Sequence, residues 1–260
     1  MILADQMGNQ IAIDTPFKRV VSLVPSQTEL IVDLIGTERL VGRTKFCIHP
    51  SEAVLNVPVI GGTKKFNFDQ ISSLKPDLII GNKEENYKDG IEQLQRDYPV
   101  WMSDINNLSD SYEMIRSVGK LLGVEEKATN LADRVEASLS SVKNSQHGRA
   151  LYFIWQRPFI VAGKSTFIDY MLRFLGFSNT CIQMRYPEMD QYVLENLDPD
   201  YVFLSSEPFP FKQKHIDSFK KMFPRASVKL VDGEMFSWYG SRLLYAADYF
   251  SGDLFLTGKL

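Results

Sequence analysis

Cysteine is scarce in this sequence: Cys47 and Cys181 are the two in 260 residues. A small disulfide-stapled scaffold needs a denser framework of cysteines, so this class is excluded. The two cysteines fall in different predicted lobes, where a bridge would lock the lobes together. We therefore expect both to be free thiols.

Long apolar runs and clusters of like charge are also absent. The longest apolar stretches, such as residues 151–155, have the length of a strand and are far too short to span a membrane. A net charge of −3 and the lack of any basic run exclude the electrostatic footprint of a nucleic-acid-binding protein. Residues 1–7 have neither the basic start nor the apolar core of a secretory signal, which leaves a cytoplasmic location open.

A repeated phrase is the most informative feature that is present. Residues 74–80 read as a helix end, a Pro-Asp turn and a buried strand, and residues 197–204 repeat this order. A duplicated α/β unit indicates two similar lobes. Small-molecule sites favour the crevice between such lobes, so the repeat favours a binding protein.

Strands and helices alternate through both halves of the chain. Uninterrupted β-branched runs such as residues 19–24 are typical of parallel strands buried on both faces, and residues 57–60 are expected to form another strand. Ser26 and Glu29 have the spacing of a capping box, which predicts a helix start there. One helix from Glu125 to about Asn144 joins the halves. We predict an α/β fold with two doubly wound (Rossmann-like) lobes joined by a long rigid helix, divided as 1–106, 107–146 and 147–260.

Ligand sites of parallel sheets lie beyond the carboxyl ends of the strands, which selects loops in each lobe. The loop at residues 236–242 holds the large rings of Trp238 and Tyr239 and a guanidinium, which suit a flat or bulky ligand with a carboxylate or amide edge. Alternatively, the loop is an aromatic lid on the end of the sheet. The turn at residues 61–65 offers N–H groups and an ammonium to an anion, or is a flexible turn with solvated lysines. The expected ligand contacts are Ser26, Gln27, Phe46, Cys47, His49, Thr63, Lys64, Trp155, Trp238, Tyr239 and Arg242.

Cys47 and His49 stand two residues apart, so in an extended loop their side chains point the same way. A thiolate and an imidazole suit zinc, copper(I) or one axial position of a chelated metal. Alternatively, Cys47 packs as a small apolar side chain and His49 caps a turn. A third alternative is a nucleophilic Cys47 with His49 as its base.

Several motifs together resemble one known family. They are the Pro-Ser-Gln-Thr-Glu turn at residues 25–29, the two Pro-Asp strands, the linking helix and the final aromatic loop with Arg242. In combination they cover nearly the whole chain. The sequence resembles the class III substrate-binding proteins of ABC importers, the helical-backbone receptors for cobalamin and iron–siderophore chelates.

This resemblance implies a non-enzymatic, monomeric receptor that requires no cofactor and delivers a metal chelate or corrinoid, such as cobalamin or a ferric chelate, to an ABC permease. It also implies a periplasmic or cell-surface location. In cobalamin-binding relatives an acid seven positions before the proline of each Pro-Asp docks on the permease. Asp69 holds that position in the first lobe, whereas the second has Tyr192 there, with Glu195 nearby. The alternative function is a cytoplasmic thiol-dependent enzyme or metal-handling protein that uses Cys47 and His49.

Overall fold

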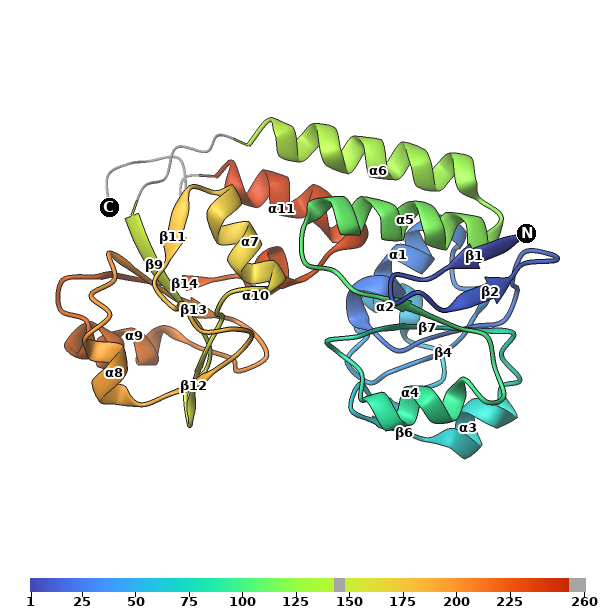
Figure 1. Cartoon of the computed structure of the whole chain (residues 1–260), viewed down its shortest axis with the longest axis horizontal. Coiled ribbons are helices and arrows are strands. Elements are labelled where there is room, and N and C mark those ends of the chain that lie inside the picture. The colour runs from blue at the N-terminus through green and yellow to red at the C-terminus, as the bar shows by residue number, and fades with distance from the viewer. Residues whose placement is uncertain (143–147, 253–260) are drawn as a thin grey trace. The chain divides into compact units, whose positions relative to one another are not determined.

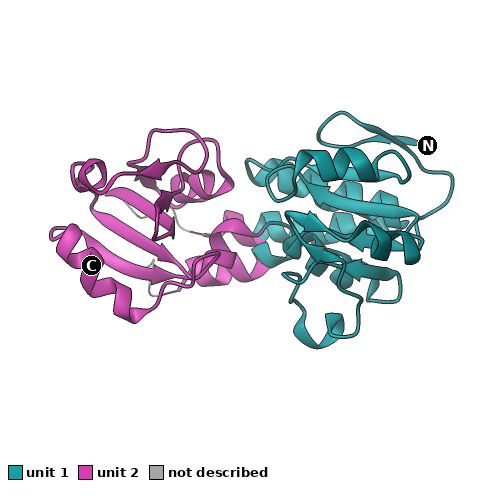
Figure 2. Cartoon of the chain, turned by 90° about the horizontal axis from the view of Figure 1, so that it is seen from below, with its two compact units in different colours: residues 1–137, 239–243 teal, residues 138–238, 244–260 magenta. Residues whose placement is uncertain are grey.

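The computed structural model (Figure 1) describes residues 1–142 and 148–252. The chain divides into two compact units, of which the first comprises Met1–Ala137 and Tyr239–Leu243 and the second Ser138–Trp238 and Leu244–Leu260 (Figure 2). The segment that the sequence analysis assigned to a separate linker thus falls mostly in the first unit. The three-part division expected from the sequence stays a prediction.

Four parallel strands form the sheet of the first unit, in the order β4-β3-β7-β8. All residues of β3, β7 and β8 are buried, as expected of strands with both faces covered. In chain order this is 2-1-3-4, so the topological switch point lies between β3 and β7. The bounds are β3 Val20–Ser22, β4 Leu40–Arg43, β7 Leu78–Asn82 and β8 Val100–Ser103.

Two short antiparallel hairpins and a set of helices complete the first unit. The hairpins are β1 (Ile2–Ala4) with β2 (Gln10–Ala12), and β5 (Gly61–Gly62) with β6 (Lys65–Phe66). The helices are α1 Pro25–Ile35, α2 Ser51–Val54, α3 Phe68–Ser73, α4 Lys88–Leu94, α5 Leu108–Leu122, the start of α6 Glu125–Ser140, and the 3-10 turn η1 Gly240–Arg242.

The start of α1 differs from the expected capping box. The helix begins at Pro25, whose fixed φ and missing N–H suit the first helical position, and Val24 precedes it without a side-chain cap. Thr28 donates its hydroxyl hydrogen bond to Ser22 instead, over 2.8 Å. The capping-box prediction is therefore wrong. The helix is capped at its C-terminal end by Gly36, with φ of 70°.

Two other sequence predictions need adjustment. Residues 57–60 do not form a strand, because pairing there is limited to one bridge between Arg43 and Val59. Helix α6 ends at Ser140. The expected end at about Asn144 lies outside the described residues.

The second unit has a mixed sheet in the order β12-β10-β9-β13-β14, with β11 also paired to β9. Its parallel members run β11-β9-β13-β14, which in chain order is again 2-1-3-4, with the switch point between β9 and β13. The strands are β9 Gly148–Trp155, β10 Phe159–Val161, β11 Phe177–Asn179, β12 Glu188–Met189, β13 Tyr201–Ser205 and β14 Ser227–Val231. The helices are α7 Phe167–Phe174, α8 Gln191–Glu195, α9 Gln213–Met222, α10 Gly233–Ser237 and α11 Leu243–Phe250.

The repeat seen in the sequence extends to the backbone. Lys75 and Asp198, which precede the two Pro-Asp pairs, both adopt the left-handed conformation, with φ of 48° and 49°. Asp77 accepts the backbone N–H of Arg19, directly before β3. Asp200 likewise accepts the backbone N–H of Arg149, at the start of β9. The two units are thus two copies of one α/β plan. None of the helices in the described part of the chain combines the length and apolar character that crossing a membrane requires.

Candidate ligand-binding site

Ser103 joins three elements at the carboxyl edge of the first sheet. Its hydroxyl accepts hydrogen bonds from Nε2 of Gln27 and, over 2.9 Å, from Nδ2 of Asn82, and it donates to the carbonyl of Gly81. Gln27 and Ser103 are fully buried, and Ser26 is 3% exposed. Ligand contact by Ser26 and Gln27 stays a prediction, and the bond that the structure gives Gln27 holds α1 to the sheet.

Asn86 fixes a turn over the switch point of this sheet. Its Nδ2 donates to the carbonyl oxygens of Thr63 (3.1 Å) and Leu23 (3.4 Å), and its Oδ1 accepts from the N–H of Asn82 (2.9 Å). Leu23 follows β3 and Asn82 ends β7. The turn between β5 and β6 is therefore anchored where parallel α/β sheets bind their ligands.

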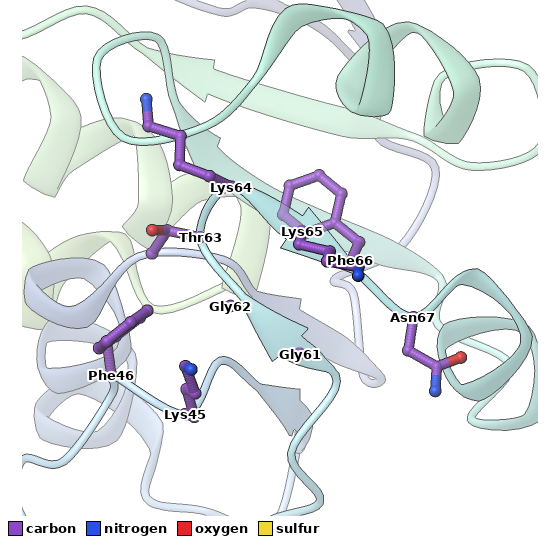
Figure 3. A pocket seen from close by; sticks show the side chains of 9 residues that line it. All are labelled: Lys45, Phe46, Gly61, Gly62, Thr63, Lys64, Lys65, Phe66 and Asn67. Carbon is purple, nitrogen blue, oxygen red and sulfur yellow. The ribbon is translucent and has the colours of Figure 1, made fainter.

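A hollow of about 560 Å³ opens beside this turn (Figure 3). The ring of Phe46 stands at it with half of its surface exposed to solvent. The hollow brings together three of the expected ligand contacts, Phe46, Thr63 and Lys64. Its lining residues are Lys45, Phe46, Gly61, Gly62, Thr63, Lys64, Lys65, Phe66 and Asn67.

Cys47 lies beneath the surface of the same loop. Its side chain is fully buried, and its Sγ lies 3.1 Å from the hydroxyl of Thr44. Burial raises the pKa of the thiol, so Cys47 is protonated at neutral pH. His49 is half-buried, and among the described residues no three His, Cys, Asp or Glu side chains are grouped to hold a metal ion. Metal ligation by Cys47 and His49 stays a prediction. A protonated thiol does not favour it, because the thiolate is the form that binds metals.

Aromatic rings gather at the switch point of the second sheet. Trp155 ends β9 with 37% of its surface exposed, and its ring meets that of Phe209 edge to face at 5.4 Å. Phe209 also lies 5.6 Å from the ring of His215, at the start of α9. Nδ1 of His215 accepts the N–H of Lys212 (2.7 Å), so the neutral ring carries its proton on Nε2 and acts there as a donor.

Trp238 and Tyr239 are less accessible than expected of side chains that face a ligand. They are 7% and 6% exposed, and the indole N–H of Trp238 donates to Glu207 over 2.8 Å. Ser237 donates to the same carboxylate oxygen over 2.9 Å. These contacts support the alternative of a packed loop, while direct ligand contact stays a prediction.

The guanidinium of Arg242 pairs with Glu29 of α1, with nitrogen–oxygen distances of 2.7 and 2.8 Å. Asp69 and Glu195, the expected docking acids, are both exposed, and Glu195 accepts a hydrogen bond from Gln191 within α8. Docking of Asp69 and Glu195 on a permease stays a prediction, because exposure alone does not test it.

Three side chains at these two edges were not expected from the sequence to contact a ligand: Lys45, Phe209 and His215. Lys45 lies in the loop after β4 and Phe209 in the loop after β13. Lys45 neighbours a selected aromatic residue, and Phe209 lies in a loop with a second phenylalanine, so the density of aromatic and basic side chains was the usable signal.

Comparison with known proteins agrees with this architecture. The family described as periplasmic binding protein matches residues 20–226. An uncharacterized ABC transporter substrate-binding lipoprotein of Bacillus subtilis is 28% identical over 216 residues, which cover 77% of this chain and 68% of that protein.

Two solved structures share the fold over most of both chains. The periplasmic vitamin B12 binding protein of Vibrio cholerae superposes with a TM-score of 0.78 and 19% identity, covering 91% of this chain and 96% of that one. A periplasmic heme binding protein from Pseudomonas aeruginosa gives 0.77 and 23%, with 94% of each chain covered. The chain belongs to the periplasmic binding protein family, and it is a substrate-binding protein rather than an enzyme.

Proposed function

We propose that this chain binds a large metal chelate, of the corrinoid, porphyrin or ferric siderophore type, and delivers it to an ABC permease. The relatives support this class, because they include proteins named for vitamin B12 and for heme. The membership of the chain in a binding-protein family excludes the alternative of a thiol-dependent enzyme built on Cys47 and His49.

The observation that carries the proposal is the exposed ring of Phe46 beside a hollow at the carboxyl edge of a parallel sheet. A half-exposed phenylalanine ring contributes to binding when an apolar ligand surface removes it from water. A broad, flat chelate provides a wide apolar face that can stack on this ring, which a small ion lacks. In the second unit, Trp155 and Phe209 present a comparable aromatic edge at the equivalent switch point.

Binding by titration calorimetry tests the proposal, with cyanocobalamin, hemin and a ferric siderophore as probes. We expect at least one of them to bind, and Phe46→Ala to weaken it about tenfold, equivalent to about 1.4 kcal/mol. Ile2→Ala is the matched control, because Ile2 is also exposed but lies in the β1–β2 hairpin. If none of the probes binds, the proposal is wrong.

Delivery to a permease would take place outside the cytoplasm, as the names of the periplasmic and lipoprotein relatives indicate. The exposed carboxylates of Asp69 and Glu195 are the proposed docking groups. Transport by reconstituted permease should fall when Asp69→Asn and Glu195→Gln are combined, while chelate affinity stays unchanged. Normal transport by this double variant would show that Asp69 and Glu195 do not dock the protein on the permease.

A further inference from the structure

The charge of the hollow in the first unit is entirely of one sign. Three lysines line it, Lys45, Lys64 and Lys65, and no aspartate or glutamate is among its lining residues (Figure 3). For a protein with a net charge of −3, this local excess of cations is unexpected. A hollow of this kind attracts an anion and disfavours a cation.

The three lysines differ in whether their ammonium groups already have a partner in the protein. Nζ of Lys64 donates to the carbonyl of Glu84 over 2.6 Å. Its positive charge also favours the ionised carboxylate of Glu85, against the effect of burial, which raises the pKa of that group. Lys45 and Lys65 make no ion pair within residues 1–142 and 148–252, and both are exposed. Their ammonium groups are therefore available to a ligand.

The floor of the hollow depends on Gly62. A Cβ atom at this position would lie 3.3 Å from the ring of Phe46 and 3.7 Å from Cε of Lys45. The absence of a side chain thus keeps open the space beneath both groups. Nζ of Lys45 lies 5.0 Å from the centre of the Phe46 ring, so a cation and an aromatic face are presented together.

We propose that this hollow is an anion subsite and that the substrate is an acidic chelate, one that carries carboxylate or phosphate groups on its periphery. The inference rests on the proposed function and narrows its ligand class. The aromatic face of Phe46 covers the edge of the chelate, while Lys45 and Lys65 pair with its peripheral acid. A neutral chelate of the same shape leaves both ammonium groups without an anion and gains less on binding.

Two pairs of chelates, each with and without the acid, test the inference. Hemin has two carboxylates that its dimethyl ester masks, so this pair differs in the acid alone. Cyanocobalamin has a phosphodiester that dicyanocobinamide lacks together with the attached ribose and benzimidazole base, so for this pair the salt dependence isolates the charge. In the pair that binds, we expect the acid-bearing member to bind about tenfold more tightly, equivalent to about 1.4 kcal/mol. The affinity of that member, and not of its neutral partner, should fall as salt is added.

The double variant Lys45→Gln/Lys65→Gln should abolish this preference by lowering the affinity of the acid-bearing member about tenfold, to that of the neutral member. Lys18→Gln/Lys120→Gln is the control, because it removes the same charge from residues that do not line the hollow. Equal binding of acid and neutral members, or an unchanged preference in the Lys45/Lys65 variant, overturns the anion subsite and leaves the proposed function standing. Failure of every chelate to bind overturns both.

Discussion

Arg242 and Glu29 form a buried ion pair between residues 213 positions apart in the sequence. Arg242 is 9% exposed and Glu29 is 5% exposed, and both guanidinium-to-carboxylate contacts are within 2.8 Å. The pair fastens the turn η1 to α1 within the first unit. It is one of the contacts that hold the segment Tyr239–Leu243 in this unit, beside the hydrogen bond from the N–H of Gly240 to Ser111.

Removing one partner of this pair should destabilise the protein strongly. Arg242→Met leaves the Glu29 carboxylate buried without its guanidinium partner, and we expect a loss of about 3 kcal/mol in the free energy of unfolding. Urea denaturation followed by circular dichroism measures it. The variant Arg242→Met/Glu29→Leu removes both charges and should recover most of the loss. A double variant as unstable as the single one would mean that packing, and not charge, is what Arg242 supplies.

The two Pro-Asp aspartates should contribute similarly to stability. Asp77 accepts the N–H groups of Lys18 (2.9 Å) and Arg19 (2.8 Å), and Asp200 accepts that of Arg149 (2.6 Å). Replacing either by alanine removes a charged acceptor at a strand start and should cost about 1 kcal/mol, because both sites are partly solvated. Urea denaturation of each variant checks this. A neutral result for both would mean that water replaces the carboxylate without cost.

Local patterns in the sequence predicted most elements of the fold. The Pro-Asp pairs and the apolar runs after them identify β7 and β13 because turn chemistry and strand burial act over a few residues. The 57–60 prediction failed because an apolar run alone does not supply a strand partner. One bridge forms there, to Val59.

The candidate site was less predictable because its contacts join distant segments. Position after a strand was enough to select the Phe46 loop. The burial of Cys47 and the bond between Gln27 and Ser103, 76 positions apart, depend on tertiary packing that no local pattern records. The expected ligand contacts therefore include both exposed side chains, such as Phe46, and buried ones, such as Cys47 and Gln27.

The thiol of Cys47 should be unreactive in the folded protein. Because burial raises its pKa above the usual 9.0, its alkylation by iodoacetamide near neutral pH should be slower than that of free cysteine. Cys181, also buried, should behave alike, and both should react rapidly in denaturant. Fast alkylation of the native protein at Cys47 would contradict the buried, protonated thiol.

The same shift predicts a pH dependence of stability. Between pH 9.0 and the higher folded pKa, the unfolded chain releases the Cys47 proton while the folded chain keeps it. The contribution to stability is therefore complete below pH 9.0 and is lost as the pH rises through this window. Cys47→Ala should lose stability less steeply above pH 9.0 than the parent chain, since other titrating groups cancel in the difference. Parallel curves of unfolding free energy against pH would contradict the shift.

Two tryptophans at the loops of the second unit should respond differently to truncation. Trp238 is 7% exposed and bonded to Glu207, so Trp238→Ala should lower the unfolding free energy by about 3 kcal/mol. Trp155 is 37% exposed, so Trp155→Ala should cost about 1 kcal/mol through its lost contact with Phe209. If the aromatic edge binds the chelate, Trp155→Ala should also weaken binding about tenfold.

Thermal unfolding and calorimetry on the same two variants separate the roles. A stable Trp238→Ala protein with weakened binding would restore the ligand role expected from the sequence and contradict the packed loop. A Trp155→Ala protein with unchanged affinity would restrict chelate recognition to other side chains. Because the indole N–H of Trp155 donates to the carbonyl of Arg157 in its own loop (3.1 Å), Trp155→Phe keeps an aromatic face but loses that bond. Binding by Trp155→Phe close to that of the parent chain would therefore assign the effect of Trp155→Ala to the aromatic face.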